Sequence, residues 1–229
     1  MAVIDVIIPA FNEADSIRLV IKEIPHSIIR NIIVINNASS DKTKQNALDA
    51  GATVIDEYRK GYGSACLAGI QYLSPNPPDI IVFLDADYSD HPNELKMIVD
   101  PIIDHNIDLV IGSRLLGKRE KGALLPQAIF GNKLACFLIK IIYGIRFTDL
   151  GPFRAIKWEA LKKLQMIDTN YGWTVEMQVK AIKQKLKITE VPVSYRKRIG
   201  ISKITGTFSG TIKAGYKILL LIFKYSFST

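Results

Sequence analysis

The stretch Ile80-Ile81-Val82-Phe83-Leu84-Asp85-Ala86-Asp87 joins an apolar run directly to two acidic residues. The five apolar residues predict a strand that is buried on both faces, as in a parallel sheet. In open parallel sheets, ligands bind at the carboxyl ends of the strands, where Asp85 and Asp87 stand. Carboxylates this close together need a cation or solvent, and oxygen ligands of this kind suit Mg²⁺ or Mn²⁺. Taken alone, an exposed acidic turn is the commoner explanation of such a pair.

Short apolar runs alternate with helical patterns on both sides of this stretch. The alternation predicts an α/β fold with a mostly parallel sheet flanked by helices. Apolar residues at positions 17, 20, 21 and 24 share one face of a helix. Ser39 or Ser40 is expected to cap the next helix, and Gly51 to end it. We expect strands at residues 3–8, 31–35, 53–56, 80–84, 109–111 and 187–195.

The composition of the 229 residues is that of a folded protein, with 48% hydrophobic and 23% charged residues. A chain of this length can bury a sizeable core, and no repeat or linker divides it, so we expect one domain. Cys66 and Cys136 have no metal-binding or disulfide spacing and are expected to be buried thiols in a reducing compartment. Met1 is followed directly by an apolar run, which does not resemble a signal peptide. We therefore expect the protein in the cytoplasm.

The positive charge of the chain is concentrated near its end. Residues 180–229 hold 11 Lys and Arg against one acid, Glu190, so this region carries +10 and the rest of the chain −2, for a net charge of +8. A basic region of this kind faces an anion, which could be phosphate, nucleic acid or an acidic lipid surface. Charge alone does not choose among the three.

Two helical patterns combine apolar residues with a few lysines. In the earlier one, Lys133 and Lys140 stand seven residues apart. In the later one, Lys213, Lys217 and Lys224 project within about 40° of one another on a helical wheel. Such helices could lie in a membrane interface with their lysines toward lipid phosphates. The alternative is that both helices pack on the core and their lysines are merely solvated.

The later pattern is too short in apolar residues to cross a membrane. Its longest apolar run is residues 218–223, whereas a spanning helix needs about 20 such residues. We therefore expect peripheral membrane contact or a membrane-protein partner, at the cytoplasmic face of a membrane.

Three further segments accompany the predicted strands. Pro9–Glu13 ends the first strand and could meet a base and ribose through its polar groups and the Phe11 ring. Asn36–Asp41 closes the second strand, although helix capping explains several of its polar residues well. Lys60–Ala65 is a glycine-bearing turn into a helix. It is weak as a dinucleotide fingerprint, because Cys66 replaces the third glycine and the turn comes late in the chain.

With these segments in this order, the sequence resembles the family 2 glycosyltransferases of the GT-A fold, especially the polyprenyl-phosphate mannose and glucose synthases. The resemblance runs from Val3 to about Gly206. It implies a Rossmann-like catalytic domain at residues 1–206, followed by an amphipathic helix at residues 207–229 that could be membrane-interfacial.

The resemblance also implies a donor site and a metal site. Asp85 and Asp87 match the family's metal motif and would hold Mg²⁺ or Mn²⁺. This chain has Asn36 and Asn37 where the family usually carries two aspartates, and Ser89 where it often carries a glutamine ligand. A basic loop would close over the donor diphosphate. The residues implied in nucleotide-sugar binding are Pro9, Ala10, Phe11, Asn12, Glu13, Asn37, Lys60, Gly61, Gly63, Asp85, Ala86, Arg198, Ser202 and Lys203.

On the acceptor side, the resemblance implies catalytic roles for Arg114 and Asp149. Arg114 would hold an acceptor phosphate. Asp149, in the segment from Thr148 to Arg154, would orient or deprotonate the acceptor. A phosphate needs only orientation because it is already ionised, whereas a hydroxyl group needs a general base. Glu176 is a further acidic candidate.

The implied reaction is a single displacement that inverts the configuration of the sugar. A hexose would pass from a donor of the GDP-mannose or UDP-glucose type to an acceptor, foremost a polyprenyl phosphate. A hydroxyl acceptor in polysaccharide or glycolipid synthesis is the alternative.

Two other classes of function compete with this one. A sugar nucleotidyltransferase would release pyrophosphate instead of a nucleoside diphosphate. A non-catalytic anion-binding module would leave Asp85 and Asp87 without a purpose. We do not expect a nucleic-acid partner.

Overall fold

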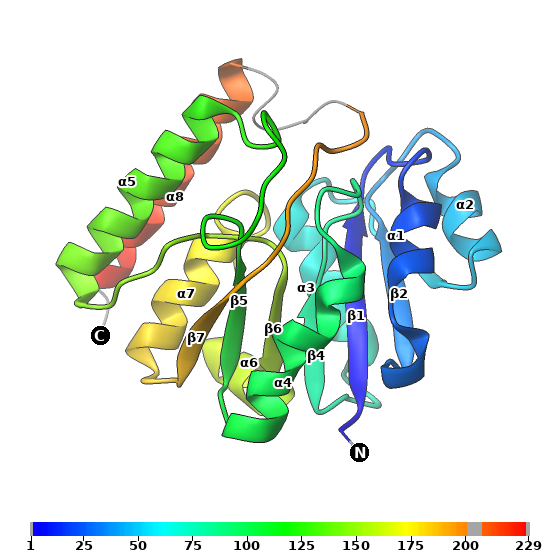
Figure 1. Ribbon diagram of the computed structural model, residues 1–229, viewed down its shortest axis with the longest axis horizontal. Helices are drawn as coiled ribbons and strands as arrows, with labels where there is room; N and C mark the ends of the chain where they lie inside the picture. Colours follow the sequence, from blue (N-terminus) through cyan, green and yellow to red (C-terminus); the bar gives the residue numbers. More distant parts are fainter. Residues whose placement is uncertain (1, 201–207, 228–229) are drawn as a thin grey trace.

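Seven strands form one sheet in the order β3-β2-β1-β4-β6-β5-β7 (Figure 1). The computed structural model describes residues 2–200 and 208–227. All neighbouring strands run parallel, except that β6 is antiparallel to both β4 and β5. The expected α/β fold with a mostly parallel sheet is therefore confirmed. The strands are β1 (Ile4–Ala10), β2 (Asn31–Asn36), β3 (Thr53–Asp56), β4 (Ile80–Phe83), β5 (Leu109–Ser113), β6 (Arg154–Lys157) and β7 (Ile188–Pro192).

The strand β6 is the one that the sequence pattern did not predict. It has four residues, and a charged side chain stands at each end, Arg154 and Lys157. No apolar run therefore marks it. Its pairing with β4 and β5 is a property of the tertiary structure, since both partners are distant in the chain.

Helices cover both faces of the sheet (Figure 1). Side chains alternate along each buried strand, so Val6 and Ile8 belong to the apolar cluster of one face and Ile7 to that of the other. The first face is covered by α1 (Ile17–Glu23), α2 (Thr43–Asp49) and α4 (Leu95–His105). The second is covered by α3 (Tyr62–Leu73), α5 (Pro126–Tyr143), α6 (Trp158–Leu164), α7 (Trp173–Lys183) and α8 (Phe208–Phe227). Short 3₁₀ turns lie at His26–Ile28 and Pro92–Glu94.

The expected cap of α2 is wrong in detail. The helix begins at Thr43, so neither Ser39 nor Ser40 stands at its N-cap. The Asp41 carboxylate instead accepts a hydrogen bond from the backbone N–H of Thr43 at 2.9 Å. The end of the helix is as expected, because Gly51 follows it with a φ of +88°.

The helix α8 packs on the core and also leaves an apolar stripe exposed. Leu221, Ile222 and Tyr225 are buried in the cluster of the second face. Figure 1 shows α8 beside α5 at the end of the molecule opposite α1 and α2. Among the described side chains of α8, the large apolar ones that stay exposed are Ile212, Tyr216, Leu220 and Phe223.

The helices of the described ranges, including α5 and α8, are all too short or too polar to cross a bilayer.

Candidate active site

The acidic motif lies just beyond the end of β4, at the carboxyl edge of the parallel strands. Oδ1 of Asp85 and both carboxylate oxygens of Asp90 are buried and have no hydrogen-bond partner among the described residues. Burial, followed by the negative charge of Asp87, raises the pKa of Asp85 to about 7. Burial, with the charges of Asp85 and Asp87, also raises the pKa of Asp90 well above its usual value. The charged forms of Asp85 and Asp90 are therefore poorly stabilised by the surrounding protein, and a bound cation would stabilise them.

The Asp87 carboxylate is held by a serine and an arginine. Its Oδ1 accepts hydrogen bonds from the backbone N–H of Ser89 at 2.9 Å and from Ser89 Oγ at 2.5 Å. Its Oδ2 pairs with Arg198 Nη1 at 3.0 Å, and Arg198 Nη2 donates to Glu13 Oε1 at 2.9 Å. Arg198 thus links two predicted donor segments that lie far apart in the chain. Of the other basic-loop residues, Ser202 and Lys203 lie outside the described residues.

The loop after β1 is tied to the loop after β2. Asn12 has a φ of +54°, and its backbone N–H donates to Ser39 Oγ at 3.0 Å. Its side-chain oxygen accepts from the backbone N–H of Ser40 at 2.8 Å. Nearby, Lys60 Nζ stands 5.3 Å from the centre of the Phe11 ring, a cation–π distance. The structure therefore brings the predicted segments Pro9–Glu13 and Lys60–Gly63 to one edge of the sheet.

Asn37 uses its whole side-chain amide inside the protein. Its Nδ2 donates to the carbonyl oxygens of Glu57 at 3.0 Å and Arg59 at 2.8 Å. Its Oδ1 accepts from the backbone N–H of Gly61 at 2.8 Å. The side chain of Asn37 therefore has a structural role, which is to hold the segment that follows β3. Its contact with a nucleotide stays a prediction.

The glycines of the turn into α3 also have a packing explanation. A Cβ at Gly61 would overlap the carbonyl oxygen of Thr169, and one at Gly63 would overlap that of Asp168. Ser64 binds the same loop, because its backbone N–H donates to Thr169 O at 2.9 Å. The glycines permit the close approach of two backbones. Their part in binding a phosphate is not tested by this packing and stays a prediction.

The Asp149 carboxylate is completely buried and fully engaged by Arg114. Its Oδ2 accepts from the backbone N–H and from Nε of Arg114, each at 2.8 Å. Its Oδ1 accepts from Nη2 of Arg114 at 2.7 Å. A carboxylate in this two-pronged ion pair is poorly placed to take a proton from an acceptor. Of the two roles left open by the sequence, the geometry favours orientation.

Three polar residues that sequence reasoning missed hold the backbone around Asp149. Glu190 on β7 accepts from the backbone N–H of Thr148 and of Asp149, each at 3.0 Å to Oε1. Asn132 on α5 donates to Thr148 O at 3.0 Å, and Gln178 on α7 donates to Asp149 O at 3.1 Å. One signal was present, because Glu190 is the single acid among the last 50 residues.

The predicted candidate Glu176 serves inside the fold, as does Arg154, the last residue of the segment that begins at Thr148. Arg154 is completely buried, and its guanidinium donates to backbone carbonyl groups, including Thr174 O at 3.0 Å. Glu176 accepts from the backbone N–H of Asp168 at 2.8 Å and from the Tyr225 hydroxyl at 2.7 Å. Its carboxylate therefore joins α7 to α8 and does not line the cavity described next.

A cavity of about 600 Å³ joins the acidic motif to the helices α5 and α8. One part of its wall is polar and the other is apolar. The charged residues that line it are Asp85, Asp87, Arg114, Asp149, Lys197 and Arg198. The apolar lining includes Leu125, Ala128, Ile129 and Leu134 from α5 and its start, and Ala214, Ile218 and Leu219 from α8.

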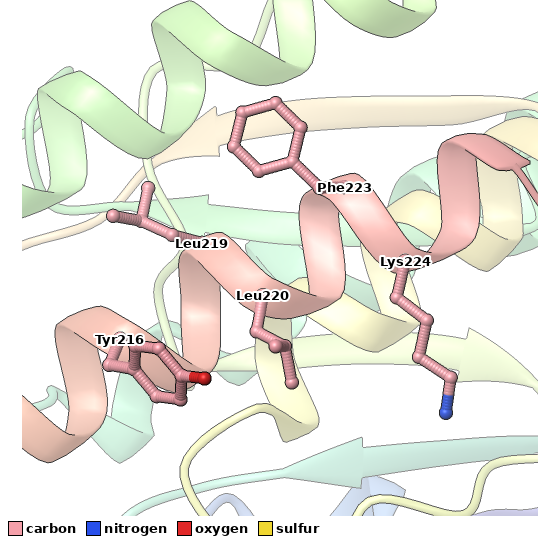
Figure 2. A pocket seen from close by; sticks show the side chains of 5 residues that line it. All are labelled: Tyr216, Leu219, Leu220, Phe223 and Lys224. Atoms are coloured by element: carbon pink, nitrogen blue, oxygen red, sulfur yellow. The ribbon is translucent and has the colours of Figure 1, made fainter.

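A second, shallower hollow of about 370 Å³ lies on the outside of α8. Figure 2 shows the five side chains that line it projecting from this helix: Tyr216, Leu219, Leu220, Phe223 and Lys224.

Within residues 2–200 and 208–227, no three His, Cys, Asp or Glu side chains are arranged to hold a metal ion by themselves.

Comparison with known proteins gives matches over most of the chain. The family model described as glycosyl transferase family 2 matches residues 5–164. A UDP-N-acetylglucosamine–dolichyl-phosphate N-acetylglucosaminyltransferase of Methanococcus voltae is 29% identical, with 94% of each chain covered. A polyprenol monophosphomannose synthase of Mycolicibacterium smegmatis is 27% identical, with 88% of this chain and 81% of that one covered.

The fold matches solved structures as well. The crystal structure of glucosyl-3-phosphoglycerate synthase from Mycobacterium tuberculosis, in complex with Mn²⁺, UDP and phosphoglyceric acid, aligns with a TM-score of 0.80. The sequences are 21% identical, and the alignment covers all of this chain and 80% of that one. At this identity the likeness shows a shared fold, and it confirms the GT-A architecture expected from the sequence.

Proposed function

This chain belongs to glycosyl transferase family 2, and from that premise we propose that it transfers a hexose from a nucleotide sugar to a lipid phosphate. The observation that carries the choice of acceptor is the cavity of about 600 Å³, whose lining combines charged residues, three cations and three carboxylates, with apolar residues of α5 and α8. An amphiphilic acceptor with a phosphate head matches both kinds of lining. The sugar would pass in one displacement, with inversion.

The state of Asp149 supports a phosphate as the attacking group. A hydroxyl acceptor needs a base to remove its proton, whereas a phosphate monoester is already ionised at neutral pH. Arg114 occupies both carboxylate oxygens of Asp149, so this residue is suited to fix Arg114 beside the acceptor. Arg114 and Lys197, which both line the cavity, would hold the phosphate.

A divalent cation fits the acidic motif. Asp85 and Asp90 present buried carboxylate oxygens without hydrogen bonds from the described residues, and the positive group beside Asp87 is Arg198. Mg²⁺ typically takes one or two protein carboxylates and completes its shell with phosphate oxygens and water. We propose Asp85 and Asp87 as the ligands, for Mg²⁺ or Mn²⁺. The ion would offset the charge that develops on the leaving diphosphate.

The donor would lie between this motif and the loop after β1. Phe11, flanked by Lys60, offers a ring for the nucleoside. Arg198 lies between Glu13 and Asp87 and could turn toward the diphosphate. We propose a donor of the GDP-mannose or UDP-glucose type. The relatives whose names include UDP-N-acetylglucosamine and a mannose product support a nucleotide-hexose donor in general.

We further propose that the face formed by α5 and α8 makes peripheral contact with a membrane. Phe130, Phe137 and Ile141 of α5 are more than half exposed, as is Tyr216 of α8. Large apolar side chains gathered on neighbouring helices indicate an interaction surface. The dolichyl phosphate and the polyprenol monophosphomannose named for two relatives favour a lipid surface over a protein one. Residues 207–229, whose helix begins at Phe208, would serve as this amphipathic element of the catalytic domain.

The test of this function is product analysis with matched acceptors. Purified protein with Mg²⁺ or Mn²⁺ is given UDP- and GDP-hexoses together with a polyprenyl phosphate or the corresponding polyprenol. We expect nucleoside diphosphate release and a glycolipid with inverted anomeric configuration from the phosphate alone. A product from the polyprenol alone would favour a hydroxyl acceptor. Release of pyrophosphate would mean a nucleotidyltransferase, and no turnover of any donor would favour a binding module.

The membrane contact has a separate test. Replacing Tyr216, Leu220 and Phe223 with serine should reduce sedimentation with anionic vesicles, because burial of apolar side chains and lysine attraction both contribute to interfacial binding. The matched control carries three exchanges on the helices of the other face, Leu19, Leu48 and Met97 to serine, which remove similar exposed apolar area. Equal sedimentation of parent and α8 variant would contradict the contact.

A further inference from the structure

The helices α5 and α8 each contain an interior glycine that helix formation does not require. Gly131 lies in the second turn of α5, and Gly215 lies well inside α8. Neither has a positive φ. Glycine is one of the least favourable residues in a helix interior, because it loses the most backbone entropy. Each position thus carries an energetic cost that calls for an explanation.

Close packing within the protein does not supply that explanation. A Cβ built at Gly131 or at Gly215 meets no atom of the described residues within 4 Å. The contrast is with Gly61 and Gly63, where the Cβ would overlap the backbone of a neighbouring loop. At Gly131 and Gly215 the space beside the helix is open.

The open space at both glycines belongs to the same cavity. Gly131 and Gly215 both line the volume of about 600 Å³ that contains Arg114, Asp149 and the acidic motif. Gly131 is also exposed, so the cavity reaches the surface beside it. The next residue toward the N-terminus, Phe130, is 70% exposed. The lining around the glycines is small or apolar: Ala128, Ile129, Ala214 and Ile218.

From these observations we infer that Gly131 and Gly215 line the binding site of the hydrocarbon part of the acceptor. This hydrocarbon chain leaves the active site between α5 and α8. This inference rests on the proposed lipid-phosphate acceptor and identifies where its chain lies. Glycine is the residue that lets a ligand approach a helix backbone most closely. The chain is tethered to its phosphate at Arg114 and Lys197, and it emerges beside the exposed side chains of α5.

The charge distribution selects this occupant over a peptide segment. An extended peptide would place backbone N–H and C=O groups against the apolar side chains of Ala128, Ile129 and Ile218, which offer them no hydrogen bonds. A hydrocarbon chain has no such groups. Arg114 and Lys197, which line the same cavity, match the phosphate head of the same molecule.

The experiment replaces each glycine with leucine. The new side chains have room within the protein, and helix propensity favours the exchange, so Gly131→Leu and Gly215→Leu should fold with a melting temperature equal to or above that of the parent. Gln71→Leu is the matched control, since it adds leucine to an exposed helix position, on α3, that does not line the cavity.

Acceptors of two lengths then distinguish binding of the hydrocarbon chain from binding of the phosphate head. For a long polyprenyl phosphate, kcat/KM should fall by about tenfold or more in both glycine variants, because even one methylene group in an apolar pocket discriminates by roughly 10–200-fold. For a short prenyl phosphate that ends before the glycines, kcat/KM should stay within about twofold, as should both values in the control. Unchanged kinetics with the long acceptor in folded variants would overturn the inference. If a leucine variant fails to fold, Gly131→Ala and Gly215→Ala provide the graded test.

Direct binding separates this inference from the proposed reaction. Binding of dodecyl phosphate is measured by calorimetry in the parent and in the leucine variants. If the parent binds this probe without turning over any lipid phosphate, and leucine weakens the binding, the binding site for the hydrocarbon chain is supported and the proposed reaction is contradicted. If the parent turns over long acceptors and leucine changes neither binding nor kinetics, the proposed reaction is supported and the binding site for the hydrocarbon chain is contradicted. If the parent neither binds dodecyl phosphate nor turns over a lipid phosphate, both are wrong.

Discussion

Two aspartate–arginine pairs line the cavity, and they differ in how completely the protein satisfies them. Asp149 is completely buried, and Arg114 reaches both of its oxygens with distances of 2.7–2.8 Å. Asp87 meets Arg198 through one oxygen at 3.0 Å, and Arg198 divides its guanidinium between Asp87 and Glu13. Nε of Arg198 is buried without a hydrogen-bond partner among the described residues.

The surroundings of the two pairs differ in the same way. The backbone at Asp149 is held by Glu190, Asn132 and Gln178, from three different elements. Around Asp87, the carboxylates of Asp85 and Asp90 retain buried oxygens without such partners. The difference distinguishes a pair whose charges the protein itself satisfies from a pair whose charges it satisfies only in part. The first pair is complete without a ligand, whereas the second holds charge that a cation or a diphosphate could take over.

The largest effect should come from breaking the complete pair. Asp149→Asn leaves the Arg114 guanidinium buried without a counter-charge, which typically costs about 3–5 kcal/mol of stability. Chemical denaturation should show this loss, with activity reduced in parallel. The double variant Asp149→Asn with Arg114→Leu should recover much of the stability, since no unpaired charge remains. A stable Asp149→Asn with a changed pH–rate profile would instead make Asp149 a proton acceptor.

The next effect should separate activity from stability at the incomplete pair. Asp87→Asn should lower kcat by about 10²–10³-fold, the usual cost of losing one electrostatic contact to the transition state. Stability without metal should change little, because the substitution also removes repulsion from Asp85 and Asp90. The control is Asp104→Asn, an exposed carboxylate on α4. Full activity of Asp87→Asn, or of the parent in excess chelator, would contradict the metal assignment.

A pH titration should sharpen the same contrast. Because burial raises the pKa of Asp85 to about 7, the folded protein binds a proton that the unfolded chain has already lost above its normal pKa. The contribution of Asp85 to stability is therefore fully present below that normal value and is lost as the pH rises through about 7. The free energy of unfolding of the metal-free parent, relative to Asp85→Asn, should fall by about 2–3 kcal/mol between pH 5 and 8. Saturating Mg²⁺ should reverse this fall, and a flat difference would contradict it.

The smallest effect is expected from the support of the complete pair. Glu190→Gln keeps a carbonyl oxygen for the backbone N–H groups of Thr148 and Asp149 but removes the charge from these bonds. A loss of about 1 kcal/mol in stability is expected, the value of a typical hydrogen bond. The KM of the acceptor should rise more than that of the donor, since Asp149 and Arg114 lie on the acceptor side. Equal changes in both KM values would argue that Glu190 supports the fold alone.

Much of the fold could be read from the sequence, because its signals are local. Buried parallel strands appear as apolar runs such as Ile80–Leu84, and the helix pattern at α1 repeats every three to four residues. The order of the motifs also identified the family and the segments near the site. The strand β6 could not be read in this way, since the charged residue Arg154 is buried only because its guanidinium reaches the backbone carbonyl groups of Leu150, Gly151 and Thr174.

The sequence by itself determined the chemistry that is available: paired carboxylates after a buried strand, cations near the chain end, and helices that mix leucine and isoleucine with lysine. The tertiary structure decided what each group does. It paired Asp149 with Arg114, used Asn37 and Glu176 inside the protein, left Asp85 and Asp90 with unpaired oxygens, and aligned α5 and α8 around one cavity. The physical reason is that a side chain's role depends on its hydrogen-bond partners and its burial, and the partners here lie up to 185 residues apart in the chain.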